Sequence, residues 1–155
     1  MNVLSNKTWL NSPSVIEWLN RTGLATIYLW FGIYKLMQHS PAQELVTNLQ
    51  QETFLHYIPS GIFLIILGLA ECIIGLLWLV PKFTKPAFIL FTLHIITTFF
   101  PLYFLPHETW ENIFILSLSG KYIVKNVVLI ASAVTIFYAY KKRIAAVSAG
   151  KSIIK

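Results

Sequence analysis

The segment between Pro59 and Pro81 constrains the fold of this chain more than any other part of the sequence. From Gly61 to Val80 it consists mainly of Ile, Leu and Gly, with Glu71 near its middle. A helix needs about 20 predominantly apolar residues to cross the hydrocarbon core of a bilayer. The sequence therefore predicts a transmembrane helix between the two prolines.

Composition extends this interpretation to the rest of the chain. Of its 155 residues, 56% are hydrophobic and only 12% are charged, which is more apolar surface than a soluble domain of this size can readily bury. Three other stretches are also long enough to cross the bilayer. We therefore expect an all-α integral membrane domain over residues 1–155, a four-helix bundle with spans at about 14–37, 61–80, 83–105 and 120–140.

Helix-start and helix-stop residues predict several span boundaries. Pro13 suits the first turn of the first span, whereas Pro101 predicts a kink or an early stop near the end of the third. We expect the fourth span to stop at Lys141. The N-terminal residues lack the hydrophobic core and small-residue cleavage site of a signal peptide, so the first span is expected to stay in the mature protein.

The two longer connections, 41–55 and 110–118, carry apolar residues at helical spacing. Leu45 and Leu49 lie one helical turn apart in the first, and Phe114 and Leu118 do so in the second. Two interpretations are open at this point. Both connections form short amphipathic helices at the membrane interface, or both are ordinary amphipathic loops.

The distribution of Lys and Arg predicts the orientation of the chain. They occur near both termini and in the turn between the second and third spans, whereas the longer connections hold glutamates. The positive-inside rule then places both termini inside. The basic residues are Lys7, Arg21, Lys82, Lys85, Lys141, Lys142, Arg143, Lys151 and Lys155, and the glutamates are Glu44, Glu52, Glu108 and Glu111. The tryptophans fit aromatic belts near the span ends: Trp9, Trp18, Trp30, Trp78 and Trp110.

Charge and cysteine content exclude several functional classes. The net charge of +6 comes from residues near span ends and in the tail, not from a basic stripe interleaved with aromatics, so nucleic acid is not an expected partner. Cys72 is the only cysteine, which excludes an intramolecular disulfide and a thiolate zinc site. His94 has no second histidine at similar depth, so neither haem ligation nor a metal site is expected. Any redox role therefore needs a bound cofactor.

Glu71 is the most informative ionisable residue because it lies too far from either end of its span to reach water. A charged side chain in hydrocarbon is costly unless it is paired or faces a wet cavity. Gly68 and Gly75 leave its face of the helix open to close approach by another helix. A lysine partner would keep the carboxylate charged. We expect Lys125 as the first candidate partner and Lys35 as the second.

Polar residues also occur in the other three spans. Arg21 and Lys35 share one face of the first span, where they either face the bundle or snorkel toward the span ends. His94 is expected to hydrogen-bond with Glu71 or with a backbone carbonyl group.

Two lysines of the fourth span, Lys121 and Lys125, share a face, and their mutual repulsion predicts carboxylates or an anionic ligand opposite them. All these residues together predict a polar core that opens outward, with a purely structural ion-pair network as the alternative. The candidate site residues are Arg21, Lys35, Glu71, His94, Lys121, Lys125 and Asn126.

Several short motifs occur in a characteristic order. They are Arg21, Trp30-Phe31-Gly32 with Lys35, Ser40-Pro41, Gly68 with Glu71 and Gly75, and Gly120-Lys121-Tyr122-Ile123-Val124-Lys125-Asn126. In these motifs the chain resembles the DoxX-like membrane family, particularly its reactive-chlorine-resistance branch. The resemblance covers about residues 20–140 and is most specific over 118–129. Asn126 stands where several family members have Asp, and this difference removes an acid and argues against a proton relay at that position.

The resemblance implies a multi-pass four-helix bundle in the bacterial inner membrane. Family members are linked to thiosulfate:quinone oxidoreductase subunits, to membrane complexes that answer oxidative stress, and to receptor-assembly chaperoning. A family with such mixed roles implies no single reaction.

Three functions follow as hypotheses. The first is an accessory or assembly subunit without catalytic activity of its own, in a larger membrane complex or a homo-oligomer. The second is a quinone-linked redox subunit in oxidative or sulfur stress metabolism, in which Lys125 or His94 bonds a quinone carbonyl. The third is a small-solute transporter, which is disfavoured because the chain has four spans and no recognisable inverted repeats.

Overall fold

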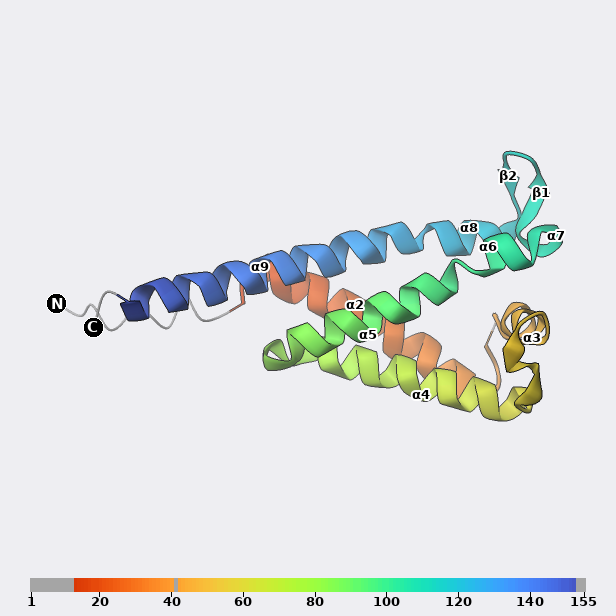
Figure 1. Ribbon diagram of the computed structural model, residues 1–155, viewed down its shortest axis with the longest axis horizontal. Helices are drawn as coiled ribbons and strands as arrows, with labels where there is room; N and C mark the ends of the chain where they lie inside the picture. Colours follow the sequence, from red (N-terminus) through yellow and green to blue (C-terminus); the bar gives the residue numbers. More distant parts are fainter. Residues whose placement is uncertain (1–12, 41, 153–155) are drawn as a thin grey trace.

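The computed structural model describes residues 13–40 and 42–152, and most of them are helical (Figure 1). The long helices are α2 (Val15–Leu36), α4 (Ser60–Leu79), α5 (Thr84–Thr98) and α9 (Asn126–Ser152). Within the described part of the chain, three helical segments are long and apolar enough to cross a membrane: Ser60–Leu79, Pro81–Phe104 and Leu118–Ala146. Helix α2 has the necessary length but is less apolar.

Helices α2 and α4 run antiparallel and pack closely against each other. Helix α2 begins after Ser14, whose hydroxyl group accepts a hydrogen bond of 3.1 Å from the backbone N–H of Glu17. At the interface with α4, a Cβ atom on Gly32 would lie only 2.8 Å from the carbonyl oxygen of Gly68. The two glycines therefore allow the two backbones to approach closely.

A short 3₁₀ turn, η2 (Pro81–Phe83), connects α4 to α5, and α5 packs against α4 and α9. Helix α5 ends at Thr98, and the chain then forms the short helices α6 (Pro101–Phe104) and α7 (Pro106–Thr109). The kink predicted at Pro101 is confirmed. Proline has no backbone N–H to continue the helical hydrogen bonds.

The last candidate span, Leu118–Ala146, consists of α8 (Leu118–Val124) and most of α9, which are separated at Lys125. The helix continues past Lys141, where the span is predicted to stop: α9 runs to Ser152 and extends beyond the other helices (Figure 1). Lys, Arg and Ala residues that follow position 140 are strong helix formers. The end of the apolar segment and the end of the helix are therefore different positions.

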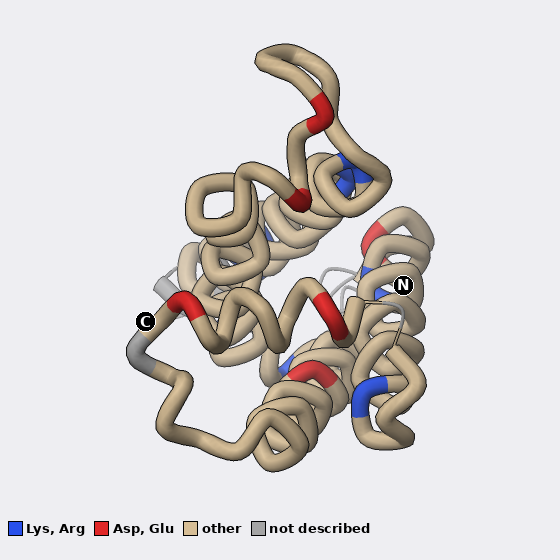
Figure 2. The backbone as a smooth tube through the Cα atoms, turned by 90° about the vertical axis from the view of Figure 1, so that its right-hand side faces the viewer, with Lys and Arg blue, Asp and Glu red and all other residues tan. Residues whose placement is uncertain are grey.

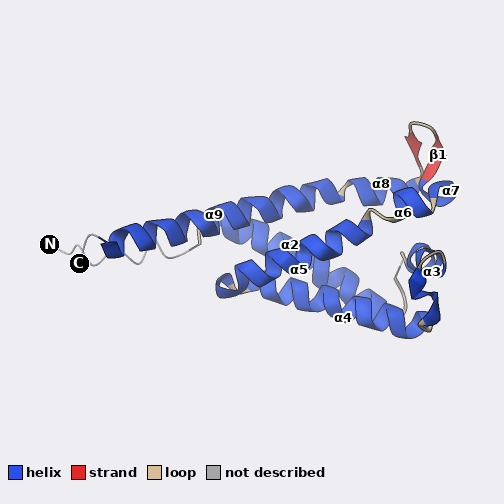
Figure 3. Cartoon of the chain, viewed as in Figure 1, coloured by secondary structure: helices blue, strands red, loops and turns tan. Residues whose placement is uncertain are grey.

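The two longer connections differ in structure (Figure 3). The first forms α3 (Gln43–Gln51) and a 3₁₀ turn, η1 (Phe54–Tyr57), which confirms the predicted helix. The second forms an antiparallel hairpin of β1 (Trp110–Asn112) and β2 (Ile115–Leu116). The interpretation of this connection as a short helix is therefore wrong. Asn112 Oδ1 accepts a 2.9 Å hydrogen bond from the N–H of Ile113, a local bond that favours a turn, and the flanking residues favour strands.

The molecule has two distinct ends, named here by the elements that lie there. The η2 end holds η2, the start of α2 and the C-terminal half of α9, while the α3 end holds α3, α7 and the hairpin (Figure 1). Figure 2 views the molecule from the α3 end and shows acidic residues on the connecting segments there.

The core lies where α2, α4, α5 and α9 meet. Trp78 is fully buried in it, so its predicted place in an aromatic belt is wrong, whereas Trp18 and Trp30 are exposed. Trp9 lies outside the described residues, as does Lys7. The buried hydrophobic residues of this core are Leu24, Ala25, Tyr28, Ile74, Trp78, Ala87, Phe91, Ile95, Ala133 and Ile136.

Candidate functional site

A buried polar cluster, formed by Tyr28, Lys35, Glu71 and His94, lies between α2, α4 and α5; we call it the central cluster. Lys35 Nζ donates to both carboxylate oxygens of Glu71, at 2.8 Å to Oε1 and 2.7 Å to Oε2. His94 Nε2 lies 3.1 Å from Glu71 Oε1. The hydroxyl group of Tyr28 lies 3.2 Å from His94 Nδ1. One continuous series of contacts thus joins all four side chains.

Local helix geometry explains how Lys35 reaches Glu71. Lys35 lies in the last turn of α2, and side chains on a helix point back toward its N-terminus. Because α2 and α4 pack so closely at Gly32 and Gly68, the lysine side chain passes directly along α4 to the carboxylate. Of the two alternatives for Lys35, a side chain facing the bundle is confirmed and snorkelling is wrong.

The histidine in the central cluster has a partner on each ring nitrogen. A neutral imidazole that carries its proton on Nε2 donates to Glu71 and accepts from the hydroxyl group of Tyr28, which satisfies both contacts. Lys35 and Glu71 neutralise each other, so the whole cluster carries no net charge in this state. The predicted hydrogen bond between His94 and Glu71 is confirmed.

Lys125, the first candidate partner for Glu71, is not its partner. Its side chain is exposed, and its Nζ atom lies 4.4 Å from the ring centroid of Tyr122 and 5.4 Å from that of Phe31. Helix α9 packs mainly against α2 and α5 instead of α4. The lysine at the α8–α9 junction therefore contacts aromatic rings of α2 and α8 and is not paired with Glu71.

The carboxylates predicted opposite the two lysines of the fourth span are also absent among the residues that the structure describes. Lys121 is exposed, and neither it nor Lys125 has an ion pair there. Glu108 instead accepts a 2.8 Å hydrogen bond from Asn48. Asn126 Nδ2 donates to Thr98 Oγ1 at 3.3 Å, linking α9 to α5.

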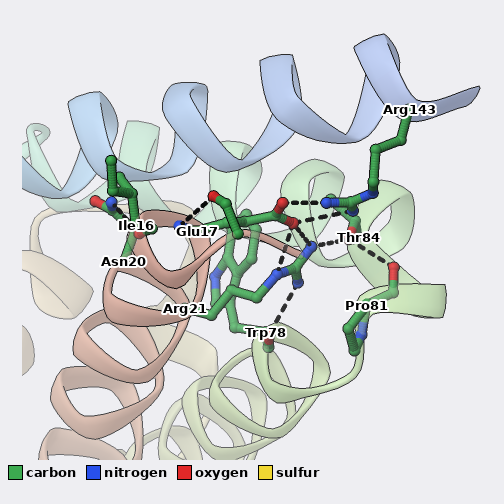
Figure 4. A network of polar contacts seen from close by, with 9 residues as sticks. Ile16, Glu17, Asn20, Arg21, Trp78, Pro81, Thr84 and Arg143 are labelled. Atoms are coloured by element: carbon green, nitrogen blue, oxygen red, sulfur yellow. Dashed lines mark hydrogen bonds and ion pairs between the residues drawn. The ribbon is translucent and has the colours of Figure 1, made fainter. Parts of the chain in front are cut away.

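A second buried cluster, which we call the η2-end cluster, joins Glu17, Arg21 and Arg143 (Figure 4). Arg21 Nε and Nη2 donate to Glu17 Oε1 at 3.0 and 2.7 Å. Both terminal nitrogens of Arg143 also contact the Glu17 carboxylate. The same Arg21 side chain donates to the backbone oxygen of Trp78 and to the Thr84 hydroxyl group. One carboxylate thus connects α9 to α2, and Arg21 connects α2 to α4 and α5.

The η2-end cluster differs from what the sequence predicted. Arg21 is 0% exposed, so of its two alternatives the one that faces the bundle is confirmed and snorkelling is wrong. Glu17 and Arg143 were not among the candidate residues. The ion pair between Glu17 and Arg21 could have been predicted from their spacing, because residues four apart in one helix lie on the same face.

The predicted polar core of seven residues is therefore divided among separate places. Lys35, Glu71 and His94 are together in the central cluster, and Arg21 belongs to the η2-end cluster. Asn126 bonds to α5, while both lysines of the fourth span are exposed. The described residues contain no group of three or more His, Cys, Asp or Glu side chains placed to hold a metal ion.

The chemistry available in the central cluster is proton exchange along a hydrogen-bonded series. A phenol, an imidazole and a carboxylate follow one another at hydrogen-bond distance, and each can accept or release a proton.

Comparisons of the chain with protein-family models, curated proteins and solved structures found no match.

Proposed function

We propose that this chain is a four-span protein of the bacterial inner membrane, of the DoxX-like family, that acts as a non-catalytic accessory or assembly subunit of a larger membrane complex. The observation that carries the proposal is the pairing of Lys35 with Glu71. Both charges of this pair are buried and satisfied inside the chain, with His94 as a further partner. Such a pair holds helices together and leaves the outer surface for lipid and partner contacts.

The distribution of residues around α2 supports a fourth span. Its charged residues Glu17, Arg21 and Lys35 are all buried against the other helices. Its exposed face carries large apolar side chains, and a membrane helix with charges needs this arrangement. The exposed large apolar residues of α2 are Val15, Ile16, Trp18, Leu19, Trp30, Ile33 and Tyr34, and the exposed Met37 follows at its C-cap.

The two ends of the molecule support an orientation with both termini inside. Exposed lysines lie at the η2 end, in η2 and in α9, while glutamates lie on α3, α7 and β1 at the α3 end. Positively charged segments stay on the inner side during insertion. The proposed inner side is therefore the η2 end.

Cysteine labelling tests this topology. In a Cys72→Ala background, single cysteines replace Glu44 on α3 and Lys142 on α9, which are both exposed. A membrane-impermeant maleimide should label position 44 in intact spheroplasts, and position 142 only after permeabilisation. The opposite pattern would invert the topology, and labelling of both positions in intact spheroplasts would exclude a shared side for the termini.

The protruding part of α9 supports the role as a subunit. Up to Arg143, which contacts Glu17, α9 lies against the bundle; after it, α9 extends beyond the bundle at the η2 end, and the exposed Lys141 and Lys142 lie just before this part. A helix that extends beyond its own bundle can contact another protein. We place the partner contact at this helix.

Purification from native membranes tests the subunit role. The tagged chain is extracted in mild detergent, cross-linked, and its co-purifying proteins are identified by mass spectrometry. We expect one partner at fixed stoichiometry, lost when Lys141 and Lys142 are changed to Glu and retained when Lys121, at the other end, is changed to Glu. Recovery of several copies of this chain alone would establish a homo-oligomer, and recovery of a monomer would contradict the proposal.

A second candidate function is that of a quinone-linked redox subunit, favoured by the contacts of His94. Reduction of a quinone to a quinol takes two electrons, which a redox partner in the complex would supply, and two protons, which the series from Tyr28 through His94 to Glu71 can relay. Saturating quinone analogues should raise the melting temperature of the protein, and His94→Ala should abolish this shift whereas Lys121→Ala should not. A melting temperature unchanged by any analogue would eliminate this candidate.

A further inference from the structure

The tip of the hairpin is the most exposed apolar segment at the α3 end. Ile113 and Phe114 are 81% and 93% exposed, and Ile115 is also exposed. The three residues form a continuous run without a charge. Soluble surfaces rarely present such a run, which indicates a contact that the chain makes with its surroundings.

The base of the hairpin is firmly attached to the neighbouring helices. The indole N–H of Trp110 donates to the backbone oxygen of Leu102 at 3.1 Å, and the N–H of Ser117 donates to the backbone oxygen of Thr109 at 3.0 Å. Gly120 packs so closely on Thr109 that a side chain there would collide with the Thr109 carbonyl oxygen. The direction of the hairpin is therefore set by contacts at its base.

The hairpin connects the ends of two segments that are apolar enough to cross a membrane, Pro81–Phe104 and Leu118–Ala146. It must therefore lie near the level where both segments leave the hydrocarbon. Figures 1 and 2 both show it leaving the bundle sideways, across the direction of the helices. A segment at that level with that direction runs along the bilayer surface.

We propose that this hairpin is an interfacial membrane anchor whose tip inserts into the outer leaflet, at the boundary between headgroups and acyl chains. The inference rests on the proposed membrane topology. Aromatic and aliphatic side chains favour this boundary layer, where one side is apolar and the other wet. Exposed Tyr103, Leu118 and Tyr122 lie on the adjoining segments α6 and α8 and continue the apolar surface toward the spans.

Lipid fits this surface better than a protein partner does. The strands contain only three and two residues, so they offer too short an edge for a partner strand. The apolar tip continues into the exposed apolar surface of α8 without an interruption by charged groups other than Lys121 and Lys125, which can reach lipid phosphates. The exposed charged residues Glu111, Lys121 and Lys125 lie on β1, on α8 and at the α8–α9 junction and stay in the headgroup layer, so the uncharged tip is the part that enters lipid.

Site-directed spin labelling in liposomes tests the anchor. In the Cys72→Ala background, a nitroxide is attached to a cysteine at Phe114, at Leu69 in the middle of α4, or at Glu44 on α3. Collision rates are measured with oxygen, which concentrates in lipid, and with a water-soluble nickel complex. At position 114 we expect the oxygen rate to exceed the nickel rate, as at position 69, with the reverse at position 44.

Each other outcome overturns the anchor in an identifiable way. A nickel rate at 114 equal to that at 44, with 69 still in lipid, places the tip in water and leaves the membrane topology intact. Low rates for both reagents at 114 mean that protein covers the tip. A water-like result at both 69 and 114 contradicts the membrane proposal itself.

Discussion

The ammonium group of Lys35 contacts both carboxylate oxygens of Glu71, at 2.8 and 2.7 Å, between two helices that meet through glycines. Both side chains are buried. Loss of one partner from a buried ion pair leaves an uncompensated charge, whereas joint replacement of both by apolar groups is often tolerated. The pair therefore makes the stability of the bundle sensitive to which partner is removed.

Lys35→Met should lower the free energy of unfolding by about 3–5 kcal/mol, because it leaves the carboxylate of Glu71 buried without its cation. Glu71→Gln should be milder, because Lys35 lies in the last turn of α2 and can turn toward the surface. The double variant Lys35→Met/Glu71→Met should recover most of the loss. The stability of all three variants is measured by thermal unfolding in detergent micelles, with size-exclusion chromatography as the readout of the folded protein.

Lys125→Ala is the matched control for this prediction. Because Lys125 is exposed and has no ion pair among the described residues, its replacement should change the free energy of unfolding by less than about 0.5 kcal/mol. If Lys125→Ala destabilises the protein as much as Lys35→Met does, the assignment of the partner of Glu71 is wrong.

The sequence predicted the need for a lysine partner at Glu71 but ranked the two candidates in the wrong order. The burial of Glu71 can be predicted from the apolar residues next to it in the sequence. The choice of partner depends on which helix lies beside α4. The periodicity of residues within one helix does not show which helix is its neighbour. Gly32 and Gly68 face each other only because α2 is the neighbour, and the helix order in space is a property of the whole bundle.

The neutral form of His94 should carry its proton on Nε2, because Nε2 faces the Glu71 carboxylate and Nδ1 faces the Tyr28 hydroxyl group. Nitrogen-15 NMR of histidine-labelled protein in bilayers distinguishes this tautomer from the other one. Tyr28→Phe should mix the tautomers and lower stability by about 1 kcal/mol, the contribution of one hydrogen bond. An Nδ1–H resonance in the unaltered protein would reverse the inferred donor directions.

The η2-end cluster predicts unequal effects for its members. Glu17→Gln leaves two guanidinium groups facing each other without a carboxylate, and should cost about 3–5 kcal/mol. Arg143→Ala should cost less, about 1–3 kcal/mol, because Glu17 keeps Arg21 and only charge-assisted hydrogen bonds are lost. Chemical unfolding in mixed micelles compares the two.

The neighbouring residue Lys142 provides the control for this cluster. It is exposed, and Lys142→Ala should leave stability within about 0.5 kcal/mol of the original. Equal losses for Lys142→Ala and Arg143→Ala would show that the charge of this segment matters and the specific contact with Glu17 does not.

The hairpin and the η2-end cluster show what local patterns omit. Ile113, Phe114 and Leu118 have the spacing of a helix face, yet the turn at Asn112 and the strand preference of its neighbours give a hairpin. Arg143 lies in a basic run that reads as a topology signal, and only the course of α9 across α2 brings it to Glu17. Helix positions depend on hydropathy along the chain and were more accessible to prediction, and three of the predicted spans are helices long and apolar enough to cross a membrane.

The closest test of the α2–α4 packing compares two glycines in the same helix. At Gly32 a Cβ atom would lie 2.7 Å from Cys72 Sγ and 2.8 Å from the backbone oxygen of Gly68, whereas at Gly23 nothing lies within 4 Å. Gly32→Ala should therefore separate the helices and lower the free energy of unfolding by about 1–3 kcal/mol. Gly23→Ala should raise it by about 0.5–1 kcal/mol, because alanine loses less backbone entropy than glycine in a helix. Thermal unfolding of both variants in the same detergent provides the measurement, and equal stabilisation of the two would mean that α2 and α4 are not in close backbone contact at Gly32.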